Sequence, residues 1–445
     1  MPDYRPLYHV APPTGWLNDP NGLVCRDGEY HLFYQWCPDV NVDGMRMYWG
    51  HAVSRDLARW EHLPVALEPD ALGSIWSGCA VDDARNTSGF FGAGGGLVAI
   101  FTHHAEFGAE RQSLAFSADR GRTWTKHAGN PVLGDDESRN FRDPKVFWHA
   151  ETSRWIMVVG VDHKLYASEN LRDWTFLSAP EFSSECPDLF PLEVEGRGEP
   201  KWLLSLGGFR YVAGDFDGVR FSPLSGPHLA DHGPDFYATQ SWEAAPGGRR
   251  IWIGWLNHWR YARAIPEFGA RGVMSIPREL ALRATTDQGL RLIQRPVREL
   301  ESLRRETVAP SGAEASSGKR FYSGDAYELE ATLVVDDEFD RCGFRLRASK
   351  TQETLVGYDG PAGGVFLDRE RSGGTVTRGR YGLVGRGKRI PLRVFVDRGS
   401  VEAFFDHGLR VFSAQIFPDA GSLDLAWFSE SGKCRAEDVK VHRLG

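Results

Sequence analysis

The C-terminal part of the chain alternates apolar and polar residues with a period of two. Over residues 327–333, Tyr327, Leu329 and Leu333 are separated by glutamate and threonine residues, and residues 392–397 carry a similar alternation. Such alternation predicts β-strands with one face in a core and the other toward solvent. Runs of this kind follow one another about 8–12 residues apart without helical patterns between them, which is typical of a two-sheet sandwich. We therefore expect a β-sandwich domain over residues 320–445.

The longer N-terminal part repeats a unit of apolar run, polar turn and tryptophan-bearing run. Three copies of the turn and its tryptophan lie at 54–60, 117–124 and 168–174. A second series of polar residues opens apolar runs at 18–20, 76–78, 142–144, 186–188 and 235–237. These starts are about 40 to 65 residues apart, which leaves room for about four strands in each interval, as in the blades of a propeller. The five starts predict a five-bladed β-propeller over residues 1–294.

A short segment between the two predicted domains carries the one clear helical pattern. Val297, Leu300 and Leu303 are three residues apart, on one face of a helix expected from Arg295 to Arg304. Residues 306–319 are rich in serine, alanine and glycine and predict turns. We therefore expect residues 295–319 to be a linker with a short helix. The predicted fold class is all-β, a five-bladed β-propeller followed by a C-terminal β-sandwich.

Charge and composition narrow the class of ligand. The 445 residues carry a net charge of −8 without long runs of one sign, which argues against nucleic acid and anionic membrane as partners and favours a neutral ligand. The chain shows no apolar stretch typical of a signal peptide or a transmembrane helix. We therefore expect a cytoplasmic protein, or a secreted one if a leader has been removed. The six cysteines are scattered without a CxxC pair, which favours reduced, mostly buried thiols over a disulfide framework or a zinc site.

Three acidic residues mark the candidate chemistry. Asp19, Asp143 and Glu185 each stand close before a proline that leads into an apolar strand, at the start of a different blade. Asp19 alone could simply cap a turn. Because blade starts surround one end of the central channel, however, the three carboxylates should converge, and their repulsion persists only where a function or a cation holds them. Two carboxylates are the equipment of a glycosidase: a separation of about 5–5.5 Å gives retention and about 6.5–9.5 Å inversion.

The surroundings of these acids suit a sugar. Four tryptophans near the blade starts offer flat apolar faces, and four polar residues offer directional hydrogen bonds. They are Trp16, Trp36, Trp49 and Trp76, and Asn18, Gln35, Ser77 and Arg142. Any single tryptophan could instead be part of the core. His103 and His104 have no third metal ligand at useful spacing, and Cys186 lacks a basic partner, so we expect no metal site and a structural thiol.

A set of motifs identifies a family resemblance. WLNDPNG at 16–22, HLFYQ at 31–35, FRDPK at 141–145, ECPDLF at 185–190 and RGVMSIPREL at 271–280 resemble, in this order, glycoside hydrolase family 32. Further matches are WGH at 49–51, WSG at 76–78 and, in the sandwich, GSVEAFFDHG at 399–408. The resemblance covers essentially the whole chain. It is greatest to levanases and exo-inulinases, on the segment 253–266.

The resemblance implies roles for the three acids. Asp19 would be the nucleophile at the anomeric carbon of a fructofuranosyl unit, and Glu185 the acid and later the base. Asp143, with Arg142 beside it, would hold ring hydroxyls and stabilise the transition state. Repulsion from Asp19 and Asp143 should raise the pKa of Glu185, so that Glu185 is protonated near neutral pH.

The remaining implications concern the pocket and the substrate. Asn18, Gln35, Trp49, Trp76 and Ser77 would line the fructosyl pocket, and no metal or organic cofactor would be needed. The expected activity is retaining exo-cleavage of terminal β-fructosyl units from levan- or inulin-type oligosaccharides and from sucrose. Hydrolysis of sucrose or sucrose 6-phosphate and fructosyl transfer are alternatives from the same family. A sugar-binding propeller without catalysis and an inverting arabinan- or xylan-type glycosidase are alternatives from outside it.

One position departs from the family pattern. A tryptophan usually precedes RGVMSIPREL, whereas this chain has only Phe268 there. Trp255, Trp259 and Phe268 are the three candidates to complete the aromatic wall on that side.

Overall fold

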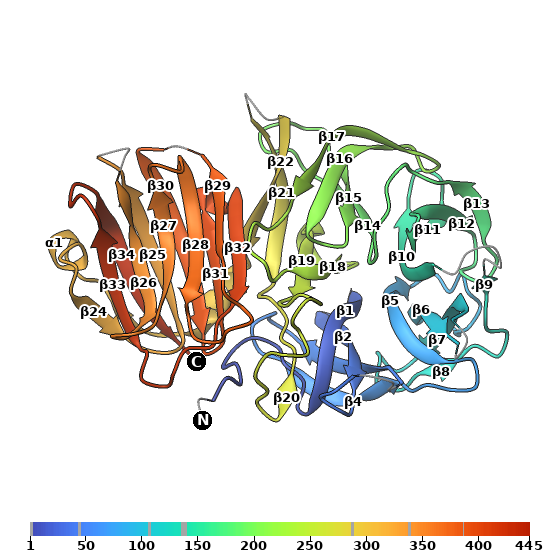
Figure 1. Cartoon of the computed structure of the whole chain (residues 1–445). Helices are drawn as coiled ribbons and strands as arrows, with labels where there is room; N and C mark the ends of the chain where they lie inside the picture. The colour runs from blue at the N-terminus through green and yellow to red at the C-terminus, as the bar shows by residue number, and fades with distance from the viewer. Residues whose placement is uncertain are drawn as a thin grey trace.

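Strands account for most of the structure. The computed structural model describes residues 3–42, 46–105, 108–134, 140–285, 289–336, 340–385 and 387–445. Five small sheets surround a common centre, and two larger sheets stack face to face beside them (Figure 1). This confirms the predicted fold class, a five-bladed β-propeller followed by a β-sandwich. Within the described residues no helix is long and apolar enough to cross a membrane.

Each of the five small sheets is one blade of antiparallel strands. The blades consist of β1 (Gly15–Arg26), β2 (Glu29–Cys37), β3 (Tyr48–Ser54) and β4 (Glu61–Leu67); β5 (Ser74–Asp83), β6 (Gly96–His104), β7 (Glu110–Ser117), β8 (Thr125–Lys126) and β9 (Leu133–Gly134); β10 (Phe141–His149), β11 (Arg154–Val161), β12 (Lys164–Ser168) and β13 (Thr175–Ser178); β14 (Asp188–Leu192), β15 (Lys201–Leu206), β16 (Arg210–Phe216) and β17 (Phe221–Leu229); and β18 (Tyr237–Ser241), β19 (Ile251–Trp255), β21 (Arg278–Thr285) and β22 (Gly289–Pro296). The five starts read from the sequence all lie in, or directly before, the first strand of a blade.

The repeated tryptophan turn has a definite structure. The indole N–H groups of Trp60, Trp124 and Trp174 each donate to the backbone carbonyl three residues earlier, at 2.9–3.2 Å. In each copy the acid or amide of the turn accepts backbone N–H groups that follow it. The repeat is therefore a capped turn between the third and fourth strands of the first three blades.

The ring of blades is closed by a segment of the fifth blade. Between β19 and β21, the chain crosses to the first blade, where β20 (Ala270–Arg271) pairs in parallel with the start of β1. A short 3-10 helix, η1 (Pro246–Gly248), connects β18 to β19. Large apolar clusters fill the spaces between neighbouring blades, so each blade is stabilised by the next.

The connection to the sandwich differs in part from the prediction. The helix expected from Arg295 to Arg304 is a single 3-10 helix, η2 (Arg298–Leu303). Val297, Leu300 and Leu303 are buried on one side, and their spacing of three matches the three residues per turn of a 3-10 helix. The turns expected over 306–319 are also partly wrong. Strand β23 (Arg304–Val308) reaches into that stretch and joins a sandwich sheet through β34, and a single helical turn, α1 (Gly312–Ala315), follows.

The sandwich consists of two six-stranded sheets with an apolar core between them. The first sheet contains β23, β34 (Arg435–Leu444), β25 (Tyr327–Val334), β30 (Arg389–Asp397), β31 (Ser400–Phe405) and β32 (Arg410–Gln415); the second contains β24 (Arg320–Ser323), β33 (Asp424–Ser429), β26 (Arg341–Ala348), β27 (Glu353–Asp359), β28 (Gly364–Arg371) and β29 (Arg380–Val384). A short 3-10 helix, η3 (Asp406–Gly408), joins β31 to β32.

A buried charged network joins the two domains. His9, which precedes the first blade, contacts the sandwich carboxylates of Asp397 (2.9 Å) and Glu402 (3.0 Å), with all three side chains fully buried. Arg278 of the last blade pairs with Glu402 and, at 3.0 Å, with Asp231. Separating the domains would break the contacts of His9 and Arg278 with Asp397 and Glu402, whereas the pair of Arg278 with Asp231 would remain within the propeller.

Candidate active site

The first strands of the blades bring the polar side chains together at one end of the channel. In four of these strands the register with the neighbouring strand shifts where the site residues lie. The shifts fall between Leu17 and Pro20, Ile75 and Gly78, Arg142 and Lys145, and Tyr237 and Gln240. A bulge of this kind redirects a side chain that regular pairing would place in the sheet. The left-handed backbone of Asp143 (φ 60°) and Cys186 (φ 46°) belongs to the same distortion.

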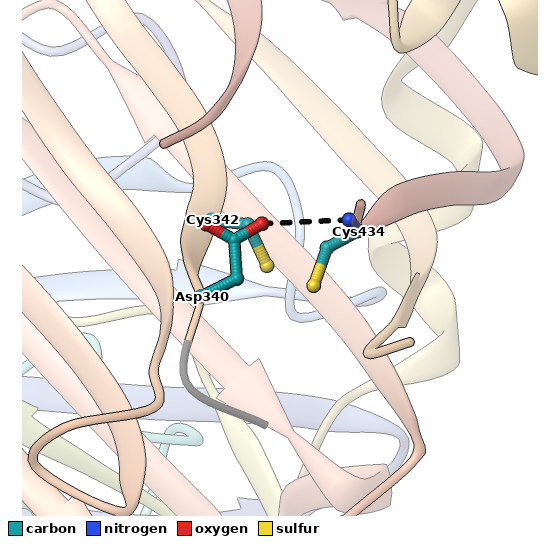
Figure 2. Close-up of side chains that lie close together, drawn as sticks. All are labelled: Asp340, Cys342 and Cys434. Atoms are coloured by element: carbon teal, nitrogen blue, oxygen red, sulfur yellow. Dashed lines mark hydrogen bonds between the residues drawn. The ribbon is translucent and has the colours of Figure 1, made fainter. Parts of the chain in front are cut away.

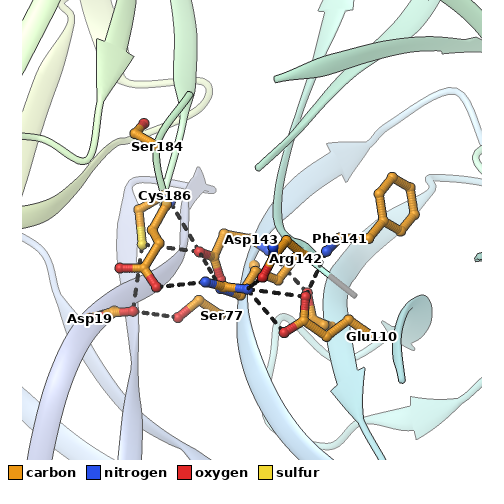
Figure 3. A network of polar contacts seen from close by, with 12 residues as sticks. Asp19, Ser77, Glu110, Phe141, Arg142, Asp143, Ser184 and Cys186 are labelled. Carbon is orange, nitrogen blue, oxygen red and sulfur yellow. Dashed lines mark hydrogen bonds and ion pairs between the residues drawn. The ribbon is translucent and has the colours of Figure 1, made fainter. Parts of the chain in front are cut away.

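Two of the predicted acids, Asp19 and Asp143, lie on either side of a thiol. Asn18 Nδ2 donates to Asp19 Oδ1 (3.0 Å) and Ser77 Oγ to Asp19 Oδ2 (2.7 Å). The Cys186 backbone N–H donates to Asp143 Oδ2 (3.0 Å), and Cys186 Sγ lies 3.5 Å from Oδ2 of both aspartates (Figure 3). The donors leave the Asp19 carboxylate fixed in one orientation.

The third acid, Glu185, is joined to the others through Arg142. Arg142 donates to Glu185 Oε1 (2.8 Å) and, from its other terminal nitrogen, to Glu110 (3.0 and 3.2 Å). Tyr237, from the fifth blade, donates its hydroxyl to Glu185 Oε2 (2.7 Å). Figure 3 shows Arg142 lying between Glu110 and the acid cluster. The structure thus brings all three predicted acids into one network with donors from every blade.

The distribution of protons among the acids differs from the prediction. Burial, followed by the nearby Asp19 carboxylate, raises the pKa of Asp143 to about 7, and burial also raises the pKa of Asp19. Burial acts in the same direction on Glu185, but the hydrogen bonds from Tyr237 and Arg142 outweigh it, so the pKa of Glu185 is lowered. The expected raised pKa of Glu185 is therefore wrong for this state, because Arg142 compensates the repulsion that the sequence argument relied on.

The acids form one wall of a cavity of about 460 Å³. It is lined by Asn18, Asp19, Gln35, Val42, Met47, Trp76, Ser77, Arg142, Asp143, Glu185, Trp259 and Arg263. Asp143 is buried at the inner end, whereas Trp259 is 40% exposed at the mouth. Five of the six predicted binding residues, Asn18, Gln35, Trp76, Ser77 and Arg142, are in this lining.

The sixth predicted binding residue, Trp49, does not line the cavity. Trp49 is completely buried among Phe33, Phe101 and other apolar residues, and its indole N–H donates to the carbonyl oxygen of Trp76 (3.1 Å). It supports the wall instead of facing the cavity, because the alternation of β3 turns its ring toward the second blade. Trp76 itself stacks on His104, with ring centroids 3.8 Å apart.

Trp259 completes the aromatic wall that the sequence left open. Its ring stacks on Trp16 at 5.9 Å and lines the cavity. Trp255 is fully buried behind it, and Phe268 packs against Ala11, Leu256 and Val273 away from the cavity.

Glu110, Tyr237 and His104 were missed as site residues. Tyr237 lies in the fifth blade start, so its position was predicted while its role was not. Nothing in the local sequence distinguishes Glu110, which reaches the site only because β7 packs beside β10. Among the described residues, groups with metal-like spacing lie in the sandwich and not in this cavity; His103 instead pairs with Asp70 (3.4 Å) and Ser113 (2.7 Å).

A five-bladed propeller with three carboxylates and an aromatic wall around one pocket defines a class of carbohydrate-active enzymes. The N-terminal domain model of glycosyl hydrolases family 32 matches residues 9–296, and the C-terminal model of that family matches residues 299–443. The chain belongs to glycosyl hydrolases family 32, and it is a glycoside hydrolase.

Individual relatives agree with this assignment. The chain is 42% identical to a levanase of Bacillus subtilis over 99% of its own length and 70% of that protein. It is 34% identical to the extracellular exo-inulinase inuE of Aspergillus ficuum, over 99% and 94% of the two chains. The structure of a β-fructofuranosidase from Schwanniomyces occidentalis complexed with fructosyl-erythritol superposes with a TM-score of 0.89 at 28% identity, covering 99% of this chain and 98% of that one.

Proposed function

We propose that the protein is a retaining exo-β-fructofuranosidase that removes terminal β-D-fructosyl units from levan- or inulin-type oligosaccharides and from sucrose. The observation that carries this proposal is the acid network: Asp19, Asp143 and Glu185 meet at one cavity wall with every carboxylate oriented by donors. The names of the levanase and exo-inulinase relatives support the fructan substrate.

Asp19 is suited to nucleophilic attack on the anomeric carbon. Asn18 and Ser77 hold its two oxygens, so the carboxylate needs no reorientation to form the covalent fructosyl intermediate. As that bond forms, the bond to the departing oxygen breaks and Glu185 transfers a proton to that oxygen. Glu185 then takes a proton from water, whose oxygen displaces Asp19 and releases fructose.

Glu185 must carry a proton for the first step. Its side chain is 37% exposed, and a sugar covering it would remove water from the carboxylate. Desolvation raises the pKa of a carboxyl group, which would oppose the effect of Arg142 and Tyr237. We infer that substrate binding itself brings Glu185 toward its acid form.

Asp143 and Arg142 are suited to hold the fructosyl ring. Asp143 lies at the buried end of the cavity, where its carboxyl group can bond to ring hydroxyls and stabilise the oxocarbenium-like transition state. The cavity runs from this buried end to the exposed Trp259, an arrangement that accepts a chain terminus and supports exo-cleavage. Trp76 and Trp259 offer apolar faces on its sides.

Fructose release from sucrose, inulin and levan tests the proposal. Wild-type protein should release fructose as the first product, whereas Asp19→Asn and Glu185→Gln should lower kcat by at least about 10³-fold. Asp215→Asn, at an exposed acid of β16 paired with Lys201 of β15, is the matched control and should retain full activity. Equal rates for wild type and the two site variants would refute the catalytic assignment.

Two further measurements separate the alternatives. The anomer first released, observed by NMR, should be the β-anomer, and inversion would exclude Asp19 as a nucleophile. Preferential hydrolysis of sucrose 6-phosphate would identify a phosphate-specific hydrolase. A high yield of longer fructosyl products from concentrated sucrose would identify a transferase.

The location of the enzyme stays a prediction. The expected location is the cytoplasm, or outside the cell if a leader has been removed, whereas the exo-inulinase relative is named extracellular. Activity measured separately in the culture medium and in washed, lysed cells of the source organism distinguishes the two.

A further inference from the structure

Two cysteines of the sandwich face one another across its two sheets. Cys342 lies in β26 of one sheet, and Cys434 directly precedes β34 of the other. Both are buried, and their sulfur atoms lie within 4.8 Å of each other. Figure 2 shows the two sulfur atoms pointing toward the same space beside Asp340.

Asp340 holds this arrangement in place. Its carboxylate accepts the backbone N–H of Ser431 (2.8 Å), the hydroxyl of Ser429 (2.5 Å) and the backbone N–H of Cys434 (3.4 Å). These bonds fix the loop between β33 and β34 above the start of β26. The position of the Cys434 backbone therefore does not depend on its own thiol.

The same contacts argue against a metal ion in this cluster. Two sulfurs and one carboxylate supply three donors, whereas a structural zinc site needs four. Both oxygens of Asp340 are already engaged with the loop. A pair of thiols that meet in a buried space with a fixed backbone is suited to a covalent bond between them.

We propose that Cys342 and Cys434 form a disulfide that links the two sheets of the sandwich. The oxidant is a small organic disulfide, such as oxidised glutathione. One cysteine thiolate attacks it to give a mixed disulfide and one equivalent of reduced thiol. The second cysteine thiolate then displaces the other equivalent, so two protein protons and two electrons are transferred and one S–S bond is exchanged for another.

The link forms during folding. Burial raises the pKa of the Cys342 thiol, so little thiolate is present in the folded domain. The loop at 430–433 is exposed and lies directly before Cys434, so it provides the opening through which slower oxidation of the folded protein proceeds. Between the cysteines lie about 90 residues, and closing a loop of that length restricts the unfolded chain strongly.

Oxidative refolding of the full-length protein tests this proposal. After refolding with a mixture of oxidised and reduced glutathione, the intact mass should be about 2 Da lower than after refolding with dithiothreitol. Proteolysis without reduction should release one peptide pair joined through Cys342 and Cys434. The midpoint of thermal unfolding should be higher for the oxidised protein by roughly 5–15 °C.

Variants at single cysteines show which pair is responsible. Cys434→Ser should remove both the mass difference and the redox dependence of the unfolding midpoint, whereas Cys25→Ser, at a buried cysteine of the first blade, should keep both. If a variant fails to fold, the peptide map of the wild type still decides. A wild-type protein without a linked pair, or with a pair other than Cys342–Cys434, would overturn the proposal.

Discussion

The buried His9 at the junction of the domains gives the protein a stability that depends on pH. Its imidazole contacts Asp397 and Glu402, and neither it nor the carboxylates reach solvent. Burial lowers the pKa of His9, but the hydrogen bonds and charges of the two carboxylates outweigh it and raise that pKa from 6.5 to about 9. We therefore expect His9 to be protonated in the folded protein at neutral pH.

The magnitude follows from the difference in proton affinity between the two states. A shift of about 2.5 units, at about 1.4 kcal/mol per unit, corresponds to about 3 kcal/mol of folding free energy. Because the folded pKa is the higher one, this contribution is complete below pH 6.5 and is lost as the pH rises through 9. The wild type should therefore lose about 3 kcal/mol of stability between pH 6 and pH 10 through this group alone.

The variant His9→Gln isolates this contribution. Urea unfolding followed by tryptophan fluorescence at several pH values should show the variant destabilised by about 3 kcal/mol at pH 6, with the difference shrinking steadily toward pH 10. His228→Gln is the control, since burial lowers the pKa of His228, so this histidine contributes no stability that is lost as the pH rises toward 9. A difference between wild type and His9→Gln that stays constant from pH 6 to pH 10 would refute the reasoning.

Three further predictions concern the pocket. Glu110→Gln leaves the charge of Arg142 less compensated, so the pKa of Glu185 should fall. The alkaline limb of the kcat/KM profile should then move to lower pH by about one unit. An unchanged alkaline limb would show that Glu110 does not influence the pKa of Glu185. Tyr237→Phe removes a donor to the Glu185 carboxylate and should move the same limb up by a similar amount, and a downward shift would contradict the structure. Trp259→Ala should raise KM for fructo-oligosaccharides about 10-fold with kcat little changed, and a loss confined to kcat would exclude a binding role at the mouth.

The blades could be predicted from the sequence because their signals are local. Each blade start combines a polar site residue with an apolar strand, and the tryptophan turns are capped within a few residues of themselves. The convergence of the three acids could be predicted for the same reason, since each lies one or two residues before a proline at a blade start. The helix before the sandwich was placed correctly but assigned the wrong type, although the spacing of its apolar residues already fitted a 3-10 turn.

What could not be predicted depends on contacts between distant strands. Trp49 has the sequence surroundings of a pocket residue, yet the packing of the first blade against the second buries it completely. Glu110 has no distinguishing neighbours in the sequence and reaches the site through its contacts with Phe141 and Arg142, about 30 residues later. The hydrogen bonds that Tyr237 and Arg142 donate to Glu185 reverse the expected direction of its pKa. Proton affinities in a cluster follow from the counter-charges that surround it, and these came from strands that no local motif connects.

The site also explains why the ring of blades must be closed. Converging three carboxylates in a buried place is unfavourable, and the donors that offset it come from separate blades: Ser77 from the second, Arg142 from the third and Tyr237 from the fifth. The first blade, which carries Asp19, is joined to the fifth through the parallel pairing of β20 with β1. Loosening that pairing would move Asp19 away from Tyr237 and Glu185 while each blade kept the hydrogen bonds within its own sheet. Catalytic competence is therefore a property of the closed ring and not of any single blade.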